Sequence, residues 1–281
     1  MASVPQKSKT KPQTGVKTIR SLERGLQVLT ILEALGPASL KQIYQASGLP
    51  RPTLLRILRT LEGTSLVRRG TGDGLYRNSF RLQNMVSKLD EGDRLAEVAA
   101  PVLNRLCAKF SWPVDLAVLN PDGPHMELRE TSRPNSPFLI NLDQIGFQIN
   151  IPLSAVGRAY IAFCGEEERL ELLERIRKSE DPQNKSARNK SAFEDILQSI
   201  HKQGYAVRDP SFGGGQRALR SLYDDGLQAI AVPIRDGETV YGTIALQWIR
   251  KAAPVEQMVS DYLSDIQDAA EEITGGYERS A

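Results

Sequence analysis

Apolar residues recur at helical spacing in the first part of the chain, where three short helices are expected. Ser21 and Ser39 are placed to cap the first two helices, and Gly36 and Gly48 to end them. The third begins with RPT, where proline suits a first helical turn. Helix, glycine-containing turn and helix predict a helix-turn-helix. The residues expected to face inward are Leu22, Leu26, Leu29 and Leu32, then Leu40, Ile43 and Ala46.

The third predicted helix, RPTLLRILRTLE, has an apolar and a polar face. The apolar sector comprises Leu54, Leu55, Ile57, Leu58 and Leu61, and the opposite sector comprises Pro52, Thr53, Arg56, Arg59 and Thr60. Exposed arginine can bind a guanine edge, and threonine can bind phosphate or contact a thymine methyl group. Solvated helices also carry these residue types, so the face alone leaves both interpretations open.

Two short segments, LVRR and LYRN, flank the glycine-rich turn GTGDG directly after this helix. They predict an antiparallel hairpin, the wing of a winged helix-turn-helix. Basic side chains on such a hairpin would bind phosphate and position the protein on DNA without reading its sequence. They are Arg68, Arg69, Arg77 and Arg81.

The segment that follows is expected to be helical on both sides of a break near Gly92. Its first apolar stripe, from Leu82 to Leu89, is too short to fold alone. We interpret residues 81–92 as a linker helix that packs against a partner, such as a second copy of the chain. An ordinary surface helix lying on its own domain is the alternative.

From Pro113 onward, alternating apolar segments predict strands at VDLAVLN, HMELRET, FLINL, YAVR, LQAIAVPI and TVYGTIALQW. Helices are expected at SAVGRAYIAF, EEERLELLERIRK, AFEDILQSIHKQG and PVEQMVSDYLSDIQDAAEEI. Hairpin-linked strands with helices around them predict an α+β domain with a mainly antiparallel sheet. SEDPQNKSARNKS and PSFGGGQRALRSL are expected to be surface loops.

The formal net charge of +2 conceals a strong separation of charge. Residues 1–81 hold 14 Lys and Arg against 4 Asp and Glu, whereas residues 82–281 hold 22 against 30. A charge of +10 on the first segment favours a polyanionic partner. Residues 1–17 have the composition of a disordered basic tail, but without them +6 remains over 64 residues. The basic character therefore belongs to the part that folds.

The two cysteines, Cys107 and Cys164, lie far apart, which excludes a disulfide framework and a cysteine-rich zinc module. They indicate a reducing, cytoplasmic compartment. No apolar run reaches the roughly 18 residues of a membrane span, and the polar N-terminus lacks the apolar segment of a signal peptide. We therefore expect no membrane partner.

No catalytic or cofactor motif is apparent. His125 and His201 are the only histidines and lack metal-ligand spacing, while GGGQR matches neither the P-loop nor the dinucleotide pattern. Asp224-Asp225 is more typical of a solvated bend than of an acid/base dyad. No catalytic residue, metal or cofactor is expected, although a site assembled from dispersed residues stays open.

The segments SLERGLQVLTIL, LPRPTLLRILRTLEGTSLVRR, LYRNSFRL, PLSAVGRAYIAF, GYAVRD and LQAIAVPIRDGETVYGTIAL occur together in one known family. Over residues 18 to about 275 the chain resembles the IclR family of bacterial transcription regulators. The resemblance implies a winged helix-turn-helix at 18–80, a linker helix at 81–92 that mediates dimerisation, and a GAF-like effector-binding domain at 93–275, followed by a tail at 276–281. It also implies dimers or dimers of dimers, bound to pseudo-palindromic double-stranded DNA.

The resemblance, together with the polar helix face, the hairpin and the residues nearby in sequence, assigns residues to both functions. Those expected at DNA are Arg20, Lys41, Arg51, Pro52, Thr53, Arg56, Arg59, Arg68, Arg69 and Arg77. Those expected at the small-molecule effector are Phe147, Ser154, Ala155, Gly157, Phe163, Asp225, Ala229, Ala245 and Gln247.

Members with small carboxylate effectors carry cysteine and serine where this chain has Ala229 and Ala245. With Phe147, Phe163 and Trp248 nearby in sequence, we expect an apolar pocket for an aromatic compound or its acid. The segments SWPVDLAVL and AFC are similar to the branch that regulates hydroxyphenylpropionate degradation, whose members are activators. That branch carries basic residues where this chain has Phe147 and Gln148.

We therefore expect a regulator of a catabolic operon, with RNA polymerase as a further partner if it activates transcription. Two alternatives stay open. One is a metabolic enzyme acting on a small aromatic compound, with an accessory basic domain. The other is an architectural DNA-binding protein that needs no ligand.

Overall fold

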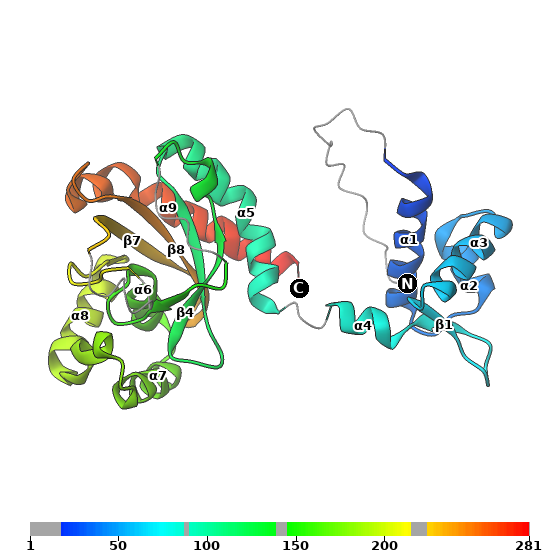
Figure 1. Ribbon diagram of the computed structural model, residues 1–281, viewed down its shortest axis with the longest axis horizontal. Coiled ribbons are helices and arrows are strands. Elements are labelled where there is room, and N and C mark those ends of the chain that lie inside the picture. The colour runs from blue at the N-terminus through cyan, green and yellow to red at the C-terminus, as the bar shows by residue number, and fades with distance from the viewer. Residues whose placement is uncertain (1–17, 87–89, 139–144, 215–223, 281) are drawn as a thin grey trace. The chain divides into compact units, whose positions relative to one another are not determined.

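The computed structural model describes residues 18–86, 90–138, 145–214 and 224–280 of the 281-residue chain (Figure 1). Contacts divide the chain into two compact units, residues 1–88 and 89–281. Each has its own hydrophobic core, so the two are described separately. Among the described helices, none combines the length and the apolar character needed to cross a membrane.

Three helices and a hairpin form the N-terminal unit, as the apolar pattern predicts. The elements are α1 (Arg20–Leu35), α2 (Leu40–Ser47), α3 (Arg51–Gly63), β1 (Val67–Arg69), β2 (Tyr76–Asn78) and α4 (Phe80–Val86). Strands β1 and β2 pair antiparallel, and an isolated bridge joins Ala38 to Tyr76. A helix-turn-helix followed by a hairpin is a winged helix-turn-helix, so this prediction is confirmed.

The expected cap of α2 is confirmed. Ser39 and Gln42 form a reciprocal capping box, in which each side chain accepts a hydrogen bond from the other residue's backbone N–H. Gly48 ends the helix in the left-handed conformation, with φ 64°. Ile43 is fully buried as expected, but Ala46 is exposed.

The inward stripe expected for α1 is partly wrong. The helix begins one residue before Ser21 and has no side-chain cap. Val28 and Leu32 face the core, whereas Leu22 and Leu26 are 59% and 56% exposed. Only the second half of α1 is covered by α2 and α3, and the helical spacing of apolar residues by itself does not reveal where that cover ends. The core comprises Val28, Leu32, Ala38, Ile43, Leu49, Leu54, Leu58, Leu61, Val67 and Tyr76.

The helical break expected near Gly92 is seen at Asp90, the extended residue that precedes α5. Gly92 is the second residue of α5 (Glu91–Phe110), and residues 87–89 are outside the described part. Asp90 and Asp93 form a reciprocal capping box at the start of α5. This cap offsets the cost of a glycine in the first turn, which is about 1 kcal/mol.

The C-terminal unit is built on a six-stranded antiparallel sheet in the order β5-β4-β3-β8-β7-β6. The predicted α+β class with a mainly antiparallel sheet is therefore confirmed. The strands are β3 (Val114–Leu119), β4 (His125–Thr131), β5 (Gln148–Asn150), β6 (Ala206–Val207), β7 (Leu227–Asp236) and β8 (Thr239–Ile249). The strand expected at FLINL lies outside the described residues apart from Phe138, which is in a bend.

Helices cover both faces of this sheet (Figure 1). One face packs against α6 (Ala155–Phe163) and α8 (Lys190–Gln203), and α7 (Glu166–Lys178) joins the same core. The other face packs against α5 and α9 (Val255–Arg279). Two 3₁₀ helices, η1 (Arg133–Asn135) and η2 (Pro182–Arg188), complete the described elements.

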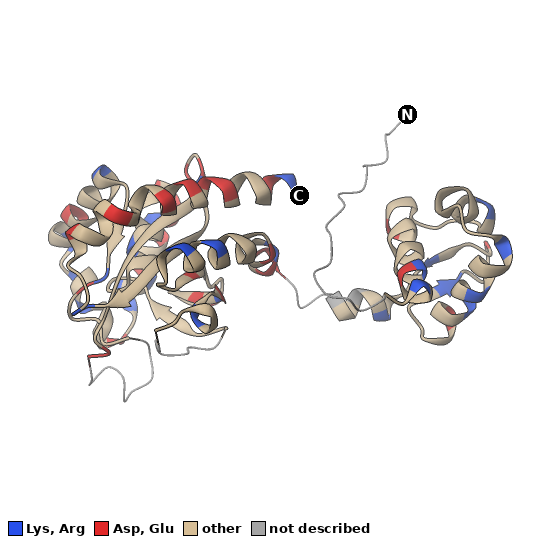
Figure 2. Ribbon diagram, turned by 90° about the horizontal axis from the view of Figure 1, so that it is seen from above, with Lys and Arg blue, Asp and Glu red and all other residues tan. Residues whose placement is uncertain are grey.

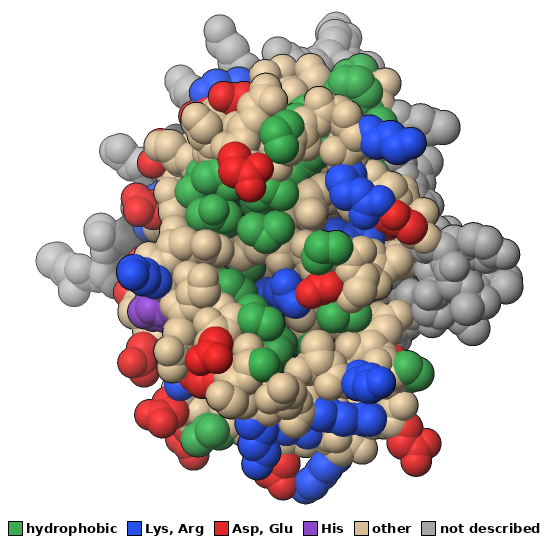
Figure 3. Space-filling model, turned by 90° about the vertical axis from the view of Figure 1, so that its left-hand side faces the viewer, with side chains coloured by type: hydrophobic (Ala, Val, Ile, Leu, Met, Phe, Trp, Pro, Cys, Tyr) green, Lys and Arg blue, Asp and Glu red, His purple; other side chains and the backbone are tan. Residues whose placement is uncertain are grey.

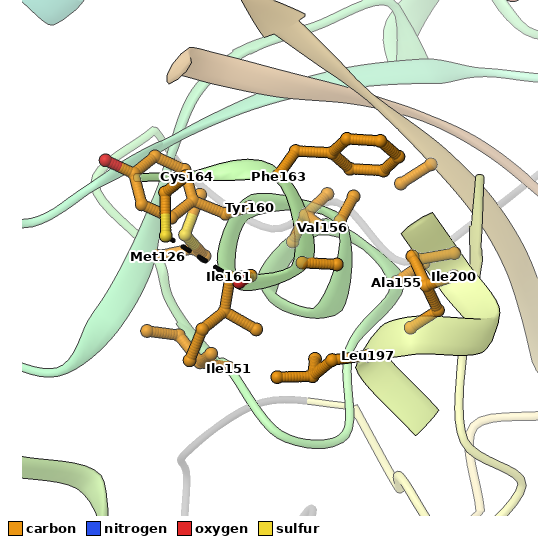
Figure 4. Close-up of a cluster of buried hydrophobic side chains, with 14 of the residues drawn as sticks. Met126, Ile151, Ala155, Val156, Tyr160, Ile161, Phe163, Cys164, Leu197 and Ile200 are labelled. Atoms are coloured by element: carbon orange, nitrogen blue, oxygen red, sulfur yellow. Dashed lines mark hydrogen bonds between the residues drawn. The ribbon is translucent and has the colours of Figure 1, made fainter. Parts of the chain in front are cut away.

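Helix α6 is buried along its whole length (Figure 4). Gly157 lies in its first turn, where an added Cβ would come 2.3 Å from the Cα of Ile151. Because that neighbour is backbone, only glycine lets the helix approach so closely. Phe163 lies at the other end of the helix, within the same hydrophobic core.

Two expectations at the edges of this unit are wrong. The polar segment SEDPQNKSARNKS contains η2, in which Asn184 is 3% exposed and accepts a hydrogen bond from the Asn150 side chain. A tail was expected from residue 276, but α9 continues to Arg279. The Tyr277 ring packs under the Arg94 guanidinium at 3.7 Å, which holds this last turn against α5.

Candidate functional site

The polar face of α3 is open to solvent, as the helical wheel predicts. Arg51, Arg56 and Arg59 are exposed, and Thr53 is half-buried. The Thr60 hydroxyl donates to the Arg56 carbonyl at 3.0 Å, which occupies its only proton. Figure 2 marks the charged positions along the ribbon, and most of those in the N-terminal unit are basic. This face therefore presents three guanidinium groups that can reach a nucleic acid.

Further basic residues lie beside α3. Arg20 lines a groove of about 700 Å³ together with Thr53 and Arg56, between α1 and α3. Lys41 is exposed in the first turn of α2, and Pro52 is exposed in the first turn of α3. The structure thus gathers these predicted residues on the N-terminal unit.

The wing arginines differ in what holds them. Arg69 donates from Nε to the Gly74 carbonyl at 2.8 Å. Arg77 forms an ion pair with Asp73, whose pKa is lowered by a hydrogen bond from the Leu75 amide and then by Arg77. Arg68 is exposed. Arg69 and Arg77, two of the four arginines expected to bind phosphate, therefore also stabilise the hairpin.

The C-terminal unit has a different surface. Figure 2 marks many acidic positions along α9, the helix that leads to the C-terminus. On the face drawn in Figure 3, acidic side chains lie among the basic ones. This mixture agrees with the net negative charge of residues 82–281. The basic residues of 1–81 all fall within the N-terminal unit.

A small cavity of about 50 Å³ lies on the sheet face that α6 covers. It brings together seven of the nine residues expected at the effector: Phe147, Ser154, Ala155, Asp225, Ala229, Ala245 and Gln247. Its other lining residues are Asp115, Leu128, Arg133, Ile149, Val156, Arg208, Phe212, Gly214 and Leu227. Segments far apart in the chain thus meet around one space.

Gly157 and Phe163 are not part of this lining. Gly157 faces the backbone of Ile151, as its close approach requires. Phe163 stacks on His201, with ring centroids 5.1 Å apart, on a different side of α6. Trp248 is fully buried in the core on the opposite sheet face, because its neighbour Gln247 points into the cavity and side chains alternate along a strand.

Most of the lining residues are apolar, as expected, but two arginine–aspartate pairs that were not expected also line the cavity. Arg133 bonds both carboxylate oxygens of Asp115 through Nε and Nη2, and both side chains are at most 5% exposed. The Thr131 hydroxyl and the Gln247 amide also donate to this carboxylate. Asp115 is thus surrounded by donors that offset the cost of burying its charge.

The second pair is Arg208 with Asp225, which lie after β6 and before β7. Arg208 follows β6, and its backbone N–H donates to the Ala229 carbonyl at 3.0 Å. Its Nη2 donates to Asp225 at 2.8 Å and to the Phe212 carbonyl at 2.6 Å. Gly214 lies against the Asp225 carboxylate, where an added Cβ would be 2.2 Å from Oδ2.

Sequence reasoning missed Asp115, Arg133, Arg208 and Phe212. One signal was available, since Asp115 stands inside the otherwise apolar strand VDLAVL, and a charge in such a strand requires a buried partner. The identity of that partner was not accessible, because Arg133 lies 18 residues away beyond a hairpin.

The Ser154 hydroxyl is already used by the fold. It donates to the Asn150 carbonyl at 2.5 Å and accepts from the Gly157 N–H at 3.0 Å, capping α6. Gln247 donates to Asp115 through Nε2, which turns its Oε1 away from that carboxylate. Gln247 thus leaves an acceptor beside the alanines of the cavity floor.

The described residues offer little for nucleophilic or metal chemistry. Burial raises the pKa of Cys164 to about 12 and also raises the pKa of Cys107, so both thiols stay protonated near neutral pH. Within the described ranges, no group of three or more His, Cys, Asp or Glu side chains could hold a metal ion.

Comparisons with known proteins agree with this division. The model of the IclR helix-turn-helix domain matches residues 21–70, and that of the bacterial transcriptional regulator IclR C-terminal domain matches residues 86–274. The chain is 25% identical over 275 residues to the transcriptional repressor IclR of Escherichia coli, covering 95% of this chain and 93% of the relative. It is 26% identical over 230 residues to the acetate operon repressor of Salmonella typhimurium, covering 79% and 80%.

A solved structure of similar fold is an IclR homolog from Microbacterium hydrocarbonoxydans complexed with 4-hydroxybenzoate. The TM-score is 0.50 at 22% identity, and the alignment covers 92% of this chain and 99% of that one. At this identity the likeness concerns the fold. The curated relatives are named as transcriptional repressors rather than as enzymes.

Proposed function

The chain belongs to the IclR family of bacterial transcriptional regulators, and from this premise we propose that it controls a catabolic operon in response to an aromatic compound or its acid. It acts in the cytoplasm as a homodimer or a dimer of dimers on a pseudo-palindromic operator. Arg51, Arg56 and Arg59 on the exposed face of α3 contact the major groove. The other basic residues of the winged helix bind phosphate.

The observation that carries the sensing function is the cavity between α6 and the sheet. Phe147 and Phe212 supply its aromatic walls, and Ala229 and Ala245 leave its floor open. The neighbour that holds 4-hydroxybenzoate supports an aromatic ligand for this fold. A cavity that binds benzene measures roughly 150 Å³, whereas this one measures about 50 Å³. An aromatic ligand therefore has to select or induce a wider state of the domain.

The wider state of the domain connects ligand binding with DNA binding. A ligand shifts a protein toward the state that it binds better, so ring binding favours the wider C-terminal unit. Residues 87–89 connect that unit to the winged helix, and α5 begins directly after them. A change at the start of α5 alters how two winged helices reach their half-sites. Where the operator lies relative to the promoter then decides repression or activation through RNA polymerase.

The test combines a ligand screen with a DNA-binding assay. Thermal unfolding of the full chain is measured with aromatic acids, phenols, aromatic amides and short aliphatic acids. We expect an aromatic compound to raise the melting temperature and to change the affinity for the upstream intergenic DNA in a gel shift. DNA binding that no compound alters would favour the ligand-independent architectural alternative.

Exposed apolar residues of the N-terminal unit support self-association. Leu22 and Leu26 on α1 are more than half exposed, as are Phe80 and Met85 on α4. Leu26 and Phe80 line one groove of about 630 Å³ between these helices. Exposed apolar surface of this kind marks an interaction site. A second copy is the occupant that a two-half-site operator requires.

Replacing Leu26 by glutamate is expected to weaken the dimer roughly 5- to 30-fold, because it places a charge in an apolar interface. Analytical ultracentrifugation of the full chain measures this effect. Leu170→Glu on α7 is the matched control, since Leu170 is 58% exposed in the other unit. Equal association of both variants would remove this groove from the interface.

A further inference from the structure

The two arginine–aspartate pairs of the cavity are built differently, and the difference singles out Arg208. The Arg133 pair is bidentate, and its carboxylate accepts from two further side chains. The Arg208 pair is a single contact from Nη2 to Asp225 Oδ1. Asp115 is thus fixed by several donors, whereas Asp225 is held to its arginine by one.

Arg208 keeps unused hydrogen-bond donors although it is 6% exposed. Its Nη2 serves both Asp225 and the Phe212 carbonyl, and the guanidinium lies 4.8 Å from the centre of the Phe212 ring. No described residue accepts a hydrogen bond from its Nε or Nη1. Neither atom is among the fully buried polar atoms without a partner in the described residues, so both keep contact with solvent, and the guanidinium lines the cavity.

Asp225 has interactions that do not depend on Arg208. Its Oδ1 also accepts the backbone N–H of Leu227 at 3.0 Å, and its side chain keeps 16% of its surface exposed. Asp225 can therefore lose its hydrogen bond with Arg208 and still keep the hydrogen bond from Leu227 and its contact with solvent. Ala229, whose carbonyl accepts from the backbone of Arg208, adds only a methyl group beside it. Among the described residues, Asp225 supplies the carboxylate that contacts the guanidinium.

We propose that Arg208 is the residue that binds the effector's acid group, and that Asp225 occupies the place of that group until a ligand carboxylate displaces it. The effector class is therefore a carboxylic acid, since the planar guanidinium fork matches a carboxylate in two parallel hydrogen bonds. This inference rests on the proposed sensing function of the cavity. It concerns the acid group of the ligand and is independent of whether the ligand carries a ring.

The test is a panel of carboxylic acids, aromatic and aliphatic, each paired with its primary amide. Benzoate with benzamide and 4-hydroxybenzoate with 4-hydroxybenzamide are two such pairs. Binding to the full chain is measured by isothermal titration calorimetry. We expect acids to bind at least about tenfold more tightly than their amides, because the neutral amide loses the charge-assisted contact.

Two substitutions separate the proposed exchange from a structural role, because they act in opposite directions. Arg208→Gln should weaken acid binding at least about tenfold, whereas Asp225→Asn should tighten it about threefold or more by removing the internal competitor. Asp225→Asn retains the acceptor for Leu227, so it keeps the test valid if Arg208→Gln fails to fold. Arg250→Gln is the matched control, since it breaks the exposed neighbouring pair with Asp224.

The outcomes distinguish this inference from the proposed function. Aliphatic acids that bind through Arg208 would support the inference and contradict an aromatic effector. An aromatic amide that binds as tightly as its acid would contradict the inference and leave the aromatic effector standing. If no acid of the panel binds, or if both substitutions weaken acid binding alike, the exchange is wrong.

Discussion

Replacing Asp115 by alanine is expected to lower the free energy of unfolding of the C-terminal unit by about 3–5 kcal/mol. Asp115 and Arg133 form the most completely buried ion pair described here, with side chains 2% and 5% exposed. Alanine would leave the guanidinium buried without its carboxylate, and the donors of Thr131 and Gln247 would lose their acceptor. Uncompensated buried charge is among the largest penalties that a single substitution causes.

Urea unfolding followed by tryptophan fluorescence measures this effect. Both tryptophans, Trp112 and Trp248, lie in the C-terminal unit, so the signal reports on that unit alone. Asp265→Ala is the control, because its partner Lys109 is 61% exposed and such surface pairs contribute about 1 kcal/mol or less. An equal decrease in the free energy of unfolding for the two variants would show that the Asp115 pair stabilises the unit no more than a surface pair does.

The double substitution Arg51→Ala with Arg56→Ala is expected to weaken specific operator binding by about 2–6 kcal/mol. Each arginine that reads a base edge contributes roughly 1–3 kcal/mol, and the losses add if the two act independently. Both side chains are exposed on α3, and neither forms an ion pair within the described part of the chain. Their removal should therefore affect DNA binding far more than folding.

Gel-shift titration at one fixed salt concentration measures the change, with the melting temperature as a check on folding. The control variant, Lys178→Ala with Lys190→Ala, removes the same number of exposed charges from the C-terminal unit. It should leave operator affinity within about twofold. If both double variants lose affinity equally, net charge rather than the α3 face explains binding.

Local patterns predicted the N-terminal unit well because the interactions that define its elements join residues close together in the chain. The Ser39–Gln42 capping box spans three residues, and the glycine-rich hairpin joins strands seven residues apart. Such contacts depend on neighbours that the sequence displays directly. The same reasoning wrongly placed Leu22 and Leu26 in the core. Helical spacing shows that apolar residues share one face of a helix, but not whether another element covers that face.

The cavity shows the opposite case. The structure brings together seven of the nine residues expected at the effector, five of which came from the family resemblance. Phe163 and Trp248 were wrongly expected beside them, because proximity along the chain does not fix which side of a helix or sheet a side chain occupies. Of the charged lining residues only Asp225 was expected, since Arg133 and Arg208 meet their carboxylates only after the sheet has formed.

The sequence by itself determined the class of each unit, the cap and turns of the winged helix, the separation of basic from acidic segments and the polar face of α3. These properties follow from composition and from the spacing of residues within one or two helical turns. Only the tertiary structure decided that two ion pairs line the cavity, and that Asp115 is held by several donors whereas Arg208 contacts Asp225 once. That decision depends on packing between strands distant in the chain, where burial makes every unpaired charge costly.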